Sequence, residues 1–327
     1  MAYFLAGDIG GTKTLLQVFR QGEVRAPVLC RSYPSAAHSG LEEMLELFLG
    51  EAGVGPVTAA CFALAGPVAG RKVQLTNLPW GVDADALAAH CQISSVTLIN
   101  DFEAVGLGIA ALQQDDLLPL QPGQAQDQGV RIVVGAGTGL GVAWLTWQAG
   151  RYAVHPSEGG HIDFAPADEL QVALLQYLQQ RHGHVSYERI VSGPGLVAIY
   201  EFLRDSGRVS PSAALLSALQ SGDHAATLAR FAASASEPIA RQTMQLFISV
   251  YGAFVGNVAL AALPRGGIYI AGGIAAKIAA EMQQGGFMHA FLDKGRFSGL
   301  LATLPLAIVN NPQVGLLGAS LRAQATA

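Results

Sequence analysis

Residues 4–19 read FLAGDIGGTKTLLQVF: an apolar run, a glycine-rich turn and a second apolar run. This arrangement predicts two short strands joined as a hairpin. The same pattern returns at residues 132–146, IVVGAGTGLGVAWLT. Glycine lets the backbone turn tightly and leaves its N–H groups uncovered, so two such turns could hold one polyphosphate from two sides.

Two ordinary hairpins would be the simpler interpretation of the glycine content alone. The polar residues of the turns favour the polyphosphate hypothesis. Asp8 supplies a carboxylate for a hydrated cation, and Thr12 and Thr138 supply hydroxyls for phosphate oxygens. A third cluster, GGIYIAGGI at residues 266–274, predicts a strand that runs into Gly272 and Gly273 and then a helix. The start of such a helix can seat a nucleotide, although a plain strand–turn–helix fits equally well.

Two better-known glycine motifs are excluded. Residues 7–14, GDIGGTKT, approach the P-loop pattern GxxxxGK[ST], but Thr12 takes the place of the last glycine. A P-loop must also open a helix, whereas the residues that follow predict a strand. The dinucleotide fingerprint GxGxxG fails because, counted from Gly135 and Gly137, its third glycine falls on Leu140.

Outside the glycine clusters, apolar runs alternate with helical patterns. We expect strands at residues 3–8, 14–19, 26–33, 57–65, 71–76, 96–100, 131–134, 267–271 and 304–309. Helices are expected at residues 39–52 behind a Ser39 cap, at residues 83–91 from Asp83, over much of residues 167–263 and at the end of the chain. Strands alternating with helices predict an α/β fold.

The chain has 327 residues, more than one domain of about 150 usually needs, so we expect two domains. Residues 113–128, QQDDLLPLQPGQAQDQ, lack periodicity and predict a surface loop or domain boundary. Residues 242–264 are uncharged and long enough to span a membrane. They contain the polar residues Ser249 and Asn257, and a single stretch of this kind is weak evidence for a membrane span. A helix buried in a soluble core is therefore the preferred interpretation.

Composition excludes several classes of protein. Hydrophobic residues reach 51% and charged residues 13%, which argues against a disordered or coiled-coil chain. The net charge is −5 and Lys and Arg form no run, so a nucleic-acid partner is not expected. The three cysteines form no CxxC pair, and neither a disulfide framework nor a structural zinc site is expected. The first residues, MAYFLAGDIGG, lack a signal-peptide pattern, so we expect a cytoplasmic protein with no membrane partner.

A set of polar residues lies at turns and strand ends. Asn100 and Asp101 end the strand expected at residues 96–100, where ligands of α/β sheets commonly bind. Glu158 and His161 flank a double glycine in PSEGGHIDF, and Glu188 lies in HVSYERIVSGPG. Taken alone, Asp101 would be interpreted as a cap of the next helix. Together, carboxylates, an amide and an imidazole suit the many neutral hydroxyls of a carbohydrate.

The motifs GDIGGTK, LTNLPW, INDFEAV, GAGTGLGVA, EGGHIDFAP, ERIVSGPG, AGGI and DKGRF follow one another over residues 3–322. In this order and spacing they closely resemble the bacterial glucokinases of the proteobacterial type, within the actin–hexokinase group of ATPases. The resemblance implies two ribonuclease H-like α/β domains around an active-site cleft. The small domain would comprise residues 1–111 and 301–327, the large one residues 112–300, and the protein would be a homodimer.

The resemblance also implies the site. Asp101 would be the base that activates the 6-hydroxyl of D-glucose, and Asp8 would hold Mg²⁺ through water. The implied glucose contacts are Asn100, Asp101, Glu158, His161 and Glu188. The implied ATP contacts are Gly7, Asp8, Ile9, Gly10, Gly11, Thr12, Gly135, Gly137, Thr138, Gly272 and Gly273. Lys13 stands where close relatives often have Asn, and it could reach a nucleotide phosphate or point to solvent.

The implied reaction is in-line transfer of the γ-phosphoryl group of ATP to glucose, giving glucose 6-phosphate, with Mg²⁺ on the ATP phosphates. A kinase for mannose or glucosamine and a non-catalytic sugar-sensing regulator remain as alternatives. A repressor is disfavoured because only six residues precede Gly7, too few for a helix-turn-helix. A cytoskeletal or chaperone ATPase would share the glycine turns but would have no use for the five sugar-type residues.

Overall fold

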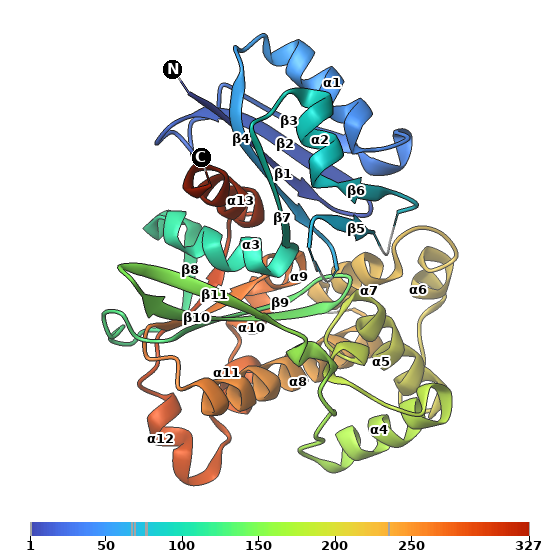
Figure 1. Cartoon of the computed structure of the whole chain (residues 1–327). Helices are drawn as coiled ribbons and strands as arrows, with labels where there is room; N and C mark the ends of the chain where they lie inside the picture. The colour runs from blue at the N-terminus through green and yellow to red at the C-terminus, as the bar shows by residue number, and fades with distance from the viewer. Residues whose placement is uncertain (1, 67, 69, 76–77, 235, 327) are drawn as a thin grey trace. The chain divides into compact units, whose positions relative to one another are not determined.

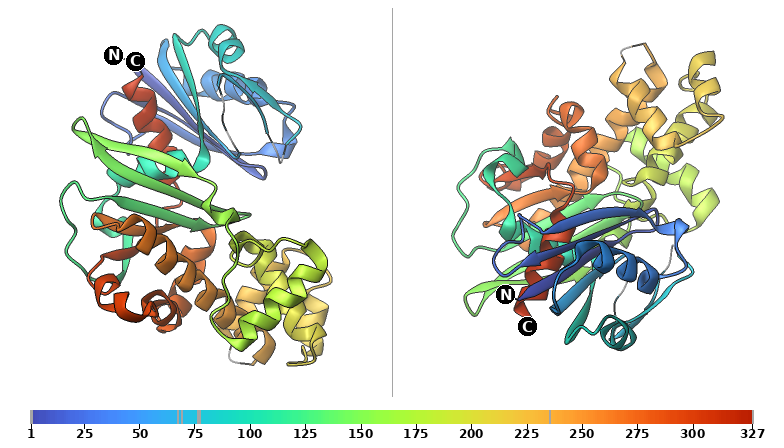
Figure 2. Two further views of the ribbon diagram at one scale, coloured as in Figure 1. Left: turned by 60° about the horizontal axis from the view of Figure 1, so that its bottom comes forward. Right: turned by 90° about the horizontal axis from the view of Figure 1, so that it is seen from above.

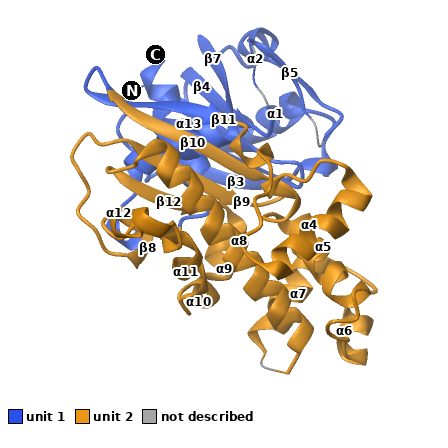
Figure 3. Ribbon diagram, turned by 90° about the horizontal axis from the view of Figure 1, so that it is seen from below, with its two compact units in different colours: residues 1–116, 148–156, 311–327 blue, residues 117–147, 157–310 orange. Residues whose placement is uncertain are grey.

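The structure is a computed structural model, and it describes residues 2–66, 68, 70–75, 78–234 and 236–326. Strands and helices alternate along the chain, so the predicted α/β class is confirmed. The chain divides into two compact units (Figure 3). Unit 1 comprises Met1–Asp116, Gln148–Pro156 and Asn311–Ala327, and unit 2 comprises Leu117–Trp147 and Ser157–Asn310.

Unit 1 is built on one twisted sheet with the strand order β3-β2-β1-β4-β7 (Figure 1). Its strands are β1 (Tyr3–Ile9), β2 (Lys13–Arg20), β3 (Leu29–Pro34), β4 (Val57–Leu64) and β7 (Ser95–Asn100). β1 pairs antiparallel with β2 and parallel with β4, and β4 pairs parallel with β7. The carboxyl ends of β1 and β7 therefore point the same way, which places Asp8 and Asn100 near one edge of the sheet.

Helices cover both faces of this sheet. Because side chains alternate along a strand, Leu5 belongs to the core under α1 (Leu41–Ala52) and α2 (Ala84–Cys91), whereas Phe4 belongs to the core with α3 (Asp101–Gly108) and α13 (Val314–Ala325). Figure 2 shows α13 running alongside β1. Smaller elements of unit 1 are η1 (Ser35–Ala37), β5 (Lys72–Gln74), β6 (Gly81–Asp83), η2 (Ile109–Ala111) and η3 (Gln114–Asp116). Residue 76 of the strand expected at 71–76 lies outside the described residues.

Glycines allow α3 and α13 to touch. A Cβ on Gly318 would lie 1.8 Å from the carbonyl oxygen of Ala104, and a Cβ on Gly108 would lie 2.0 Å from that of Val314. No side chain fits at either position, so the two helices pack backbone to backbone. The end of the chain is in this way fixed against the helix that begins at Asp101.

The cap of α1 differs from the prediction. Gly40, rather than Ser39, is the N-cap residue. The N–H and hydroxyl of Ser39 both donate to the Glu43 carboxylate, at 2.9 and 2.7 Å. The carboxylate of Glu43, in the first turn of α1, therefore binds Ser39, so that the Ser39 hydroxyl does not cap the helix. The helix predicted to start at Asp83 is α2, and Asp83 is its N-cap residue.

Unit 2 contains a second sheet with the strand order β10-β9-β12-β13-β8. Its strands are β8 (Leu117–Gln121), β9 (Arg131–Ala136), β10 (Leu140–Gln148), β12 (Gly267–Ala271) and β13 (Leu306–Val309). β11 (Arg151–Ser157) follows β10 after a turn at Ala149 and Gly150, and most of it is counted in unit 1. Residues 113–128 were predicted to be a surface loop or a domain boundary, and a unit boundary does fall there, between Asp116 and Leu117. As a loop the prediction is wrong in part, because β8 pairs antiparallel with β13 at the sheet edge. Pro119 is tolerated there because an edge strand leaves one side unpaired.

The helices of unit 2 surround a large apolar core. They are η4 (Gly159–His161), α4 (Glu169–His182), η5 (Tyr187–Arg189), α5 (Gly193–Asp205), α6 (Ala213–Ala218), α7 (His224–Ala233), α8 (Pro238–Ala262), α9 (Gly273–Lys277), α10 (Ala279–Met282), α11 (Gly286–Leu292), η6 (Gly295–Phe297) and α12 (Ser298–Leu301). By length and composition α8 could cross a membrane, but 72% of its apolar window is buried inside unit 2. It packs against α5, α7 and α11 and is the central core helix that the sequence favoured.

The unit boundaries differ from the domain boundaries expected from the sequence. Residues 112–116 and 148–156 fall in unit 1, and residues 301–310 fall in unit 2. The last difference has a simple cause, since β13 pairs with β12 and β8. The return of the chain to unit 1 therefore begins at Asn311, just before α13.

Candidate active site

The first glycine turn, residues 10–12, joins β1 to β2 as the sequence predicted. The N–H of Gly10 donates to the carbonyl of Lys13 at 3.1 Å, which closes the turn. Gly7 lies within β1 and has a packing reason of its own. A Cβ there would lie 2.7 Å from Phe62 and 2.9 Å from Leu16.

Asp8 follows Gly7 and is the acidic residue of this turn region. Burial and the Asp101 carboxylate raise the pKa of Asp8 to about 6, and Lys13 opposes the increase. A Cβ on Gly315 would lie 3.2 Å from Oδ2 of Asp8, so the carboxylate sits against the first turn of α13. The structure therefore brings two carboxylates, Asp8 and Asp101, close enough to repel one another.

Asn100, not Asp101, caps α3. Its Oδ1 accepts hydrogen bonds from the N–H groups of Phe102 and Glu103 at 2.8 and 3.1 Å, and its Nδ2 donates to the Gly66 carbonyl at 2.9 Å. The interpretation of Asp101 as a simple helix cap is thus wrong, because the chain turns at the end of β7 so that Asn100 takes the N-cap position. Nδ2 carries two N–H groups and one of them is used on the Gly66 carbonyl, so the other remains for a ligand.

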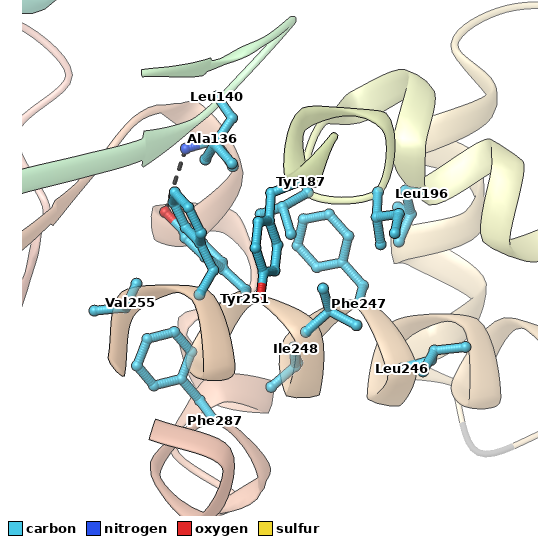
Figure 4. Packing of buried hydrophobic residues seen from close by; sticks show 14 of the residues in the cluster. Ala136, Leu140, Tyr187, Leu196, Leu246, Phe247, Ile248, Tyr251, Val255 and Phe287 are labelled. Atoms are coloured by element: carbon cyan, nitrogen blue, oxygen red, sulfur yellow. Dashed lines mark hydrogen bonds between the residues drawn. The ribbon is translucent and has the colours of Figure 1, made fainter. Parts of the chain in front are cut away.

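The second glycine turn joins β9 to β10. The N–H of Gly137 donates to the Gly139 carbonyl, and the N–H of Gly193 at the start of α5 donates to the Gly137 carbonyl, both at 2.8 Å. Below the turn, the hydroxyl of buried Tyr251 accepts a hydrogen bond from the N–H of Ala136 at 3.2 Å (Figure 4). The core helix α8 therefore supports the end of β9. Gly135 is a buried strand residue opposite Gly141.

The third glycine cluster follows β12. Gly272 has φ +87°, and a Cβ there would lie 2.5 Å from the Ala136 carbonyl, so this position needs glycine. A Cβ on Gly273 would meet nothing within 4 Å. The helix that follows, α9, has five residues. Its dipole is correspondingly small, so the N-terminus of α9 adds little to the binding of a nucleotide at Gly272 and Gly273.

A cavity of about 490 Å³ connects the second and third clusters within unit 2. Gly137, Thr138 and Gly273 line it, together with apolar residues of α5, α7 and α9. The lining residues that the sequence analysis missed are Gly193, Pro194, Leu196, Val197, Asp223, His224, Ala225, Ala226, Ala229, Ile274, Lys277 and Ile278. The glycine turn SGPG at residues 192–195 is a signal that could have indicated one wall, but no local signal in the sequence connects α7 with the cavity.

Glu158, His161 and Glu188 form a polar cluster at η4 and η5. Nε2 of His161 lies 3.9 Å from Oε2 of Glu158 and 3.9 Å from Oε1 of Glu188. These distances are too long for hydrogen bonds, so the imidazole of His161 is not tied to either carboxylate by a hydrogen bond. The side chains of Glu158 and His161 are 77% and 58% exposed, whereas that of Glu188 is 30% exposed.

Glu188 is held in place from two directions. Its Oε2 accepts a hydrogen bond from the N–H of Leu140, at the end of the second glycine turn, at 2.9 Å. Its neighbour Tyr187 is buried, packs its ring at a tilt of 42° against Phe254 with centroids 4.6 Å apart, and accepts a hydrogen bond from Asn257 at 2.9 Å. Phe254 and Asn257 both belong to α8. Figure 4 shows Tyr187 lying against this helix.

The structure places the predicted residues in two groups, one within each unit. Unit 1 brings together Asp8, the turn of residues 10–12, Asn100 and Asp101. Unit 2 brings together the second and third glycine clusters around the cavity, and sets Glu158, His161 and Glu188 beside the second turn.

Comparison with known proteins identifies the family. Residues 5–326 match the sequence model of the glucokinase family. The chain belongs to the glucokinase family. It is 44% identical to a glucokinase of Nostoc punctiforme over 98% of each chain.

Solved structures agree with this assignment. A glucokinase from an Antarctic psychrotroph superposes with a TM-score of 0.86 at 28% identity, covering 99% of both chains. A glucokinase of the ROK family from Streptomyces griseus, solved with glucose and AMPPNP, has a TM-score of 0.66 at 20% identity and covers 99% of this chain and 100% of that one. The predicted fold of the actin–hexokinase type is thereby confirmed.

Proposed function

We propose that this glucokinase-family chain transfers the γ-phosphoryl group of ATP to the 6-hydroxyl of D-glucose. One observation supports this most strongly: the second glycine turn lies between a nucleotide-sized cavity and the polar cluster. Gly137 and Thr138 line the cavity, and Leu140 of the same turn donates its N–H to Glu188. A phosphate on this turn would therefore lie between a nucleoside in the cavity and a sugar on the cluster.

The cavity is suited to the nucleoside part of ATP. Its walls are mostly apolar, as a purine ring requires, and Leu196, Ala225 and Ile274 contribute to them. Asp223, His224 and Lys277 add polar groups at the lining for a ribose or its phosphates. We assign Gly135, Gly137, Thr138, Gly272 and Gly273 to this nucleotide, and residues 7–12 to its phosphates. The relative from Streptomyces griseus was solved with AMPPNP, which supports an adenine nucleotide.

The sugar is assigned to residues of both units. Glu158, His161 and Glu188 can bind ring hydroxyls through carboxylate and imidazole atoms, and Asn100 can add the remaining N–H of its amide. Asp101 is assigned to the 6-hydroxyl. Glucose as the substrate is supported by the names of the relatives.

Phosphoryl transfer needs positioning and charge stabilisation more than covalent catalysis. An ionised Asp101 orients the 6-hydroxyl and accepts its proton as the oxygen bonds to the γ-phosphorus and the bond to ADP breaks. The N–H groups of the glycine turns and the hydroxyls of Thr12 and Thr138 hold phosphate oxygens. Exclusion of water by the bound sugar and nucleotide prevents hydrolysis of ATP.

Mg²⁺ fits the acidic residues of unit 1. Carboxylate oxygens and water are the ligands that this ion prefers, and it commonly uses one or two carboxylates plus substrate phosphates. Among the residues that the structure describes, no three His, Cys, Asp or Glu side chains converge on one point. We therefore assign Asp8 to hold the ion through water. When bound, the ion neutralises charge on the ATP phosphates.

The proposed function is tested by a coupled assay of ADP release with and without sugar. Turnover is expected with ATP, Mg²⁺ and glucose and not without glucose. Mannose and glucosamine in parallel measure the preference among hexoses. A sample that binds glucose but releases no ADP would instead identify a sugar-sensing regulator. Glucose should also raise the melting temperature in proportion to the logarithm of its concentration over Kd.

Two further properties belong to the proposal and need their own measurements. Sedimentation equilibrium would establish whether the protein is the homodimer that its family resemblance implies. Fractionation of cells would test the expected cytoplasmic location.

A further inference from the structure

Ser35, a residue that the sequence analysis did not single out, makes two hydrogen bonds with the first glycine turn and one with β2 directly after it. It begins η1 directly after β3 and is fully buried. Its N–H donates to the Thr12 carbonyl at 3.0 Å, and its Oγ donates to the Gly10 carbonyl at 2.7 Å. Its Oγ also lies 3.0 Å from Oγ1 of Thr14, the second residue of β2.

The direction of these hydrogen bonds follows from counting protons. A serine hydroxyl has one proton, and the Gly10 carbonyl can only accept. The Ser35 proton is therefore used on Gly10, and Thr14 must be the donor in its contact with Ser35. The result is a buried relay from the Thr14 hydroxyl through Ser35 to the Gly10 carbonyl. Consecutive hydrogen bonds of this kind strengthen one another.

These hydrogen bonds use more of the carbonyl groups of the turn than of its N–H groups. The carbonyls of Gly10, Thr12 and Lys13 are all used, by Ser35 Oγ, by Ser35 N–H and by the N–H of Gly10 respectively. Across the described part of the chain, the N–H groups of Gly11 and Thr12 have no such partner. With the carbonyls of Gly10 and Thr12 used and the N–H groups of Gly11 and Thr12 available, this turn is suited to binding an anion.

We infer that Ser35 is a positioning residue for phosphoryl transfer: it fixes the first glycine turn so that the N–H groups of Gly11 and Thr12 are held ready for the phosphates of ATP. It contacts the turn and not the nucleotide. This inference rests on the proposed function, because it assigns the turn to ATP. It predicts that loss of the Ser35 hydroxyl weakens the use of ATP far more than the use of glucose.

The test compares Ser35→Ala with a matched control, Ser320→Ala. Ser320 is also fully buried in unit 1, donates to the Leu316 carbonyl at 2.7 Å and accepts from Gln17 at 2.6 Å, but it has no contact with the turn. Steady-state kinetics gives KM and kcat for ATP and glucose, and calorimetry gives the Kd of Mg·AMPPNP. For Ser35→Ala, kcat/KM for ATP should fall about tenfold, equivalent to about 1.4 kcal/mol, and Kd for Mg·AMPPNP should rise similarly. The glucose Kd should change less than twofold.

The control separates positioning from stability. Both variants should lower the melting temperature, because each removes a buried hydroxyl, but Ser320→Ala should leave the affinity for Mg·AMPPNP within twofold of wild type. An unchanged affinity in Ser35→Ala, or an equal loss in both variants, would overturn the inference. If Ser35→Ala does not fold, Thr14→Val is measured in its place. It removes the donor end of the relay at constant shape and should give a smaller loss in the same direction.

The wild-type protein is assayed first. Absence of glucose-dependent ADP release from a folded wild type would refute the proposed function. Activity in wild type with normal nucleotide affinity in Ser35→Ala would refute the role of Ser35 alone.

Discussion

Oε2 of Glu188 accepts a hydrogen bond from the backbone N–H of Leu140 at 2.9 Å, while Oε1 of the same carboxylate faces Nε2 of His161 at 3.9 Å. One side chain thus joins the glycine turn assigned to ATP to the cluster assigned to glucose. Gly160 strengthens the connection, because a Cβ there would lie 2.0 Å from the Leu140 carbonyl. The backbone of Leu140 is therefore hydrogen-bonded to Glu188 through its N–H and lies closely against Gly160, between Glu158 and His161, at its carbonyl.

Removing this carboxylate should affect both substrates. In Glu188→Ala, KM for glucose should rise about 10- to 100-fold, the effect of losing a hydrogen bond to a charged group. KM for ATP should rise several-fold because the turn loses its anchor. Glu158→Ala is the control, since Glu158 belongs to the same cluster and is highly exposed. It should raise KM for glucose and leave KM for ATP unchanged. Equal ATP kinetics in the two variants would argue against the connection.

The same connection can be tested from the turn itself. A Cβ on Gly139 would lie 2.5 Å from Oε2 of Glu188, whereas a Cβ on Gly137 would meet nothing within 4 Å. Gly139→Ala should therefore displace the carboxylate and raise KM for glucose several-fold, although residue 139 is not assigned to the sugar. Gly137→Ala, two residues away, should leave KM for glucose unchanged. Steady-state kinetics on the two variants measures KM for glucose. Equal values would refute the proposed connection between the glycine turn and the Glu188 carboxylate.

The sequence predicted the glycine turns and the polar residues because both depend on local rules. Tight turns need glycine, and ligands bind at the ends of parallel strands. It did not predict that Asn100 takes the cap position in place of Asp101, since both residue types cap helices well and the choice depends on where the turn after β7 closes.

The contacts that the sequence did not predict join residues far apart along the chain. Ser35 lies 25 residues from Gly10, and Glu188 lies 48 residues from Leu140. No sequence periodicity reports such contacts, because they depend on how distant segments pack. β8 was missed for a different reason: Pro119 and its Gln- and Asp-rich surroundings are also typical of a surface loop.

Asp8 should make the stability of the protein depend on pH. In the folded chain its pKa is about 6, above its ordinary value of 3.8, so the proton binds the folded state more tightly than the unfolded one. The stabilisation is complete below pH 3.8 and is lost as the pH rises through about 6. Asp8→Asn, which stays neutral, should therefore melt at a higher temperature than wild type at pH 7.5, and the difference should shrink at pH 5.

The same variant should lose activity while it gains stability, since neutral Asn is a weaker ligand for hydrated Mg²⁺ than a carboxylate. Turnover should fall strongly, with the glucose Kd largely unchanged. In wild type, kcat/KM for Mg·ATP should decrease as the pH is lowered through about 6, where Asp8 takes up its proton. A melting difference that does not vary between pH 5 and 7.5 would show that Asp8 titrates normally.

Asp101→Asn tests the proposed base most directly. The substitution keeps the size and hydrogen-bonding capacity of the side chain but removes its charge and basicity. General-base catalysis contributes about 10²–10⁴-fold, so kcat should fall by that order. The glucose Kd should change far less, because an amide can still bind a hydroxyl and four other contacts are assigned to the sugar. Rapid-quench measurement of phosphoryl transfer and calorimetric glucose binding give the two quantities separately.

Structural side effects of Asp101→Asn should be small, and they can be measured. Asn100 supplies the N-cap of α3, so the substitution does not uncap the helix, and the melting temperature should fall by little or rise. The Asp101 charge raises the pKa of Asp8, so its removal should shift the pH dependence attributed to Asp8 to lower pH. A shifted profile with kcat within a few-fold of wild type would confirm that the carboxylates interact and would exclude Asp101 as the base. Loss of kcat with an intact fold and a shifted profile is the result expected of a base beside Asp8.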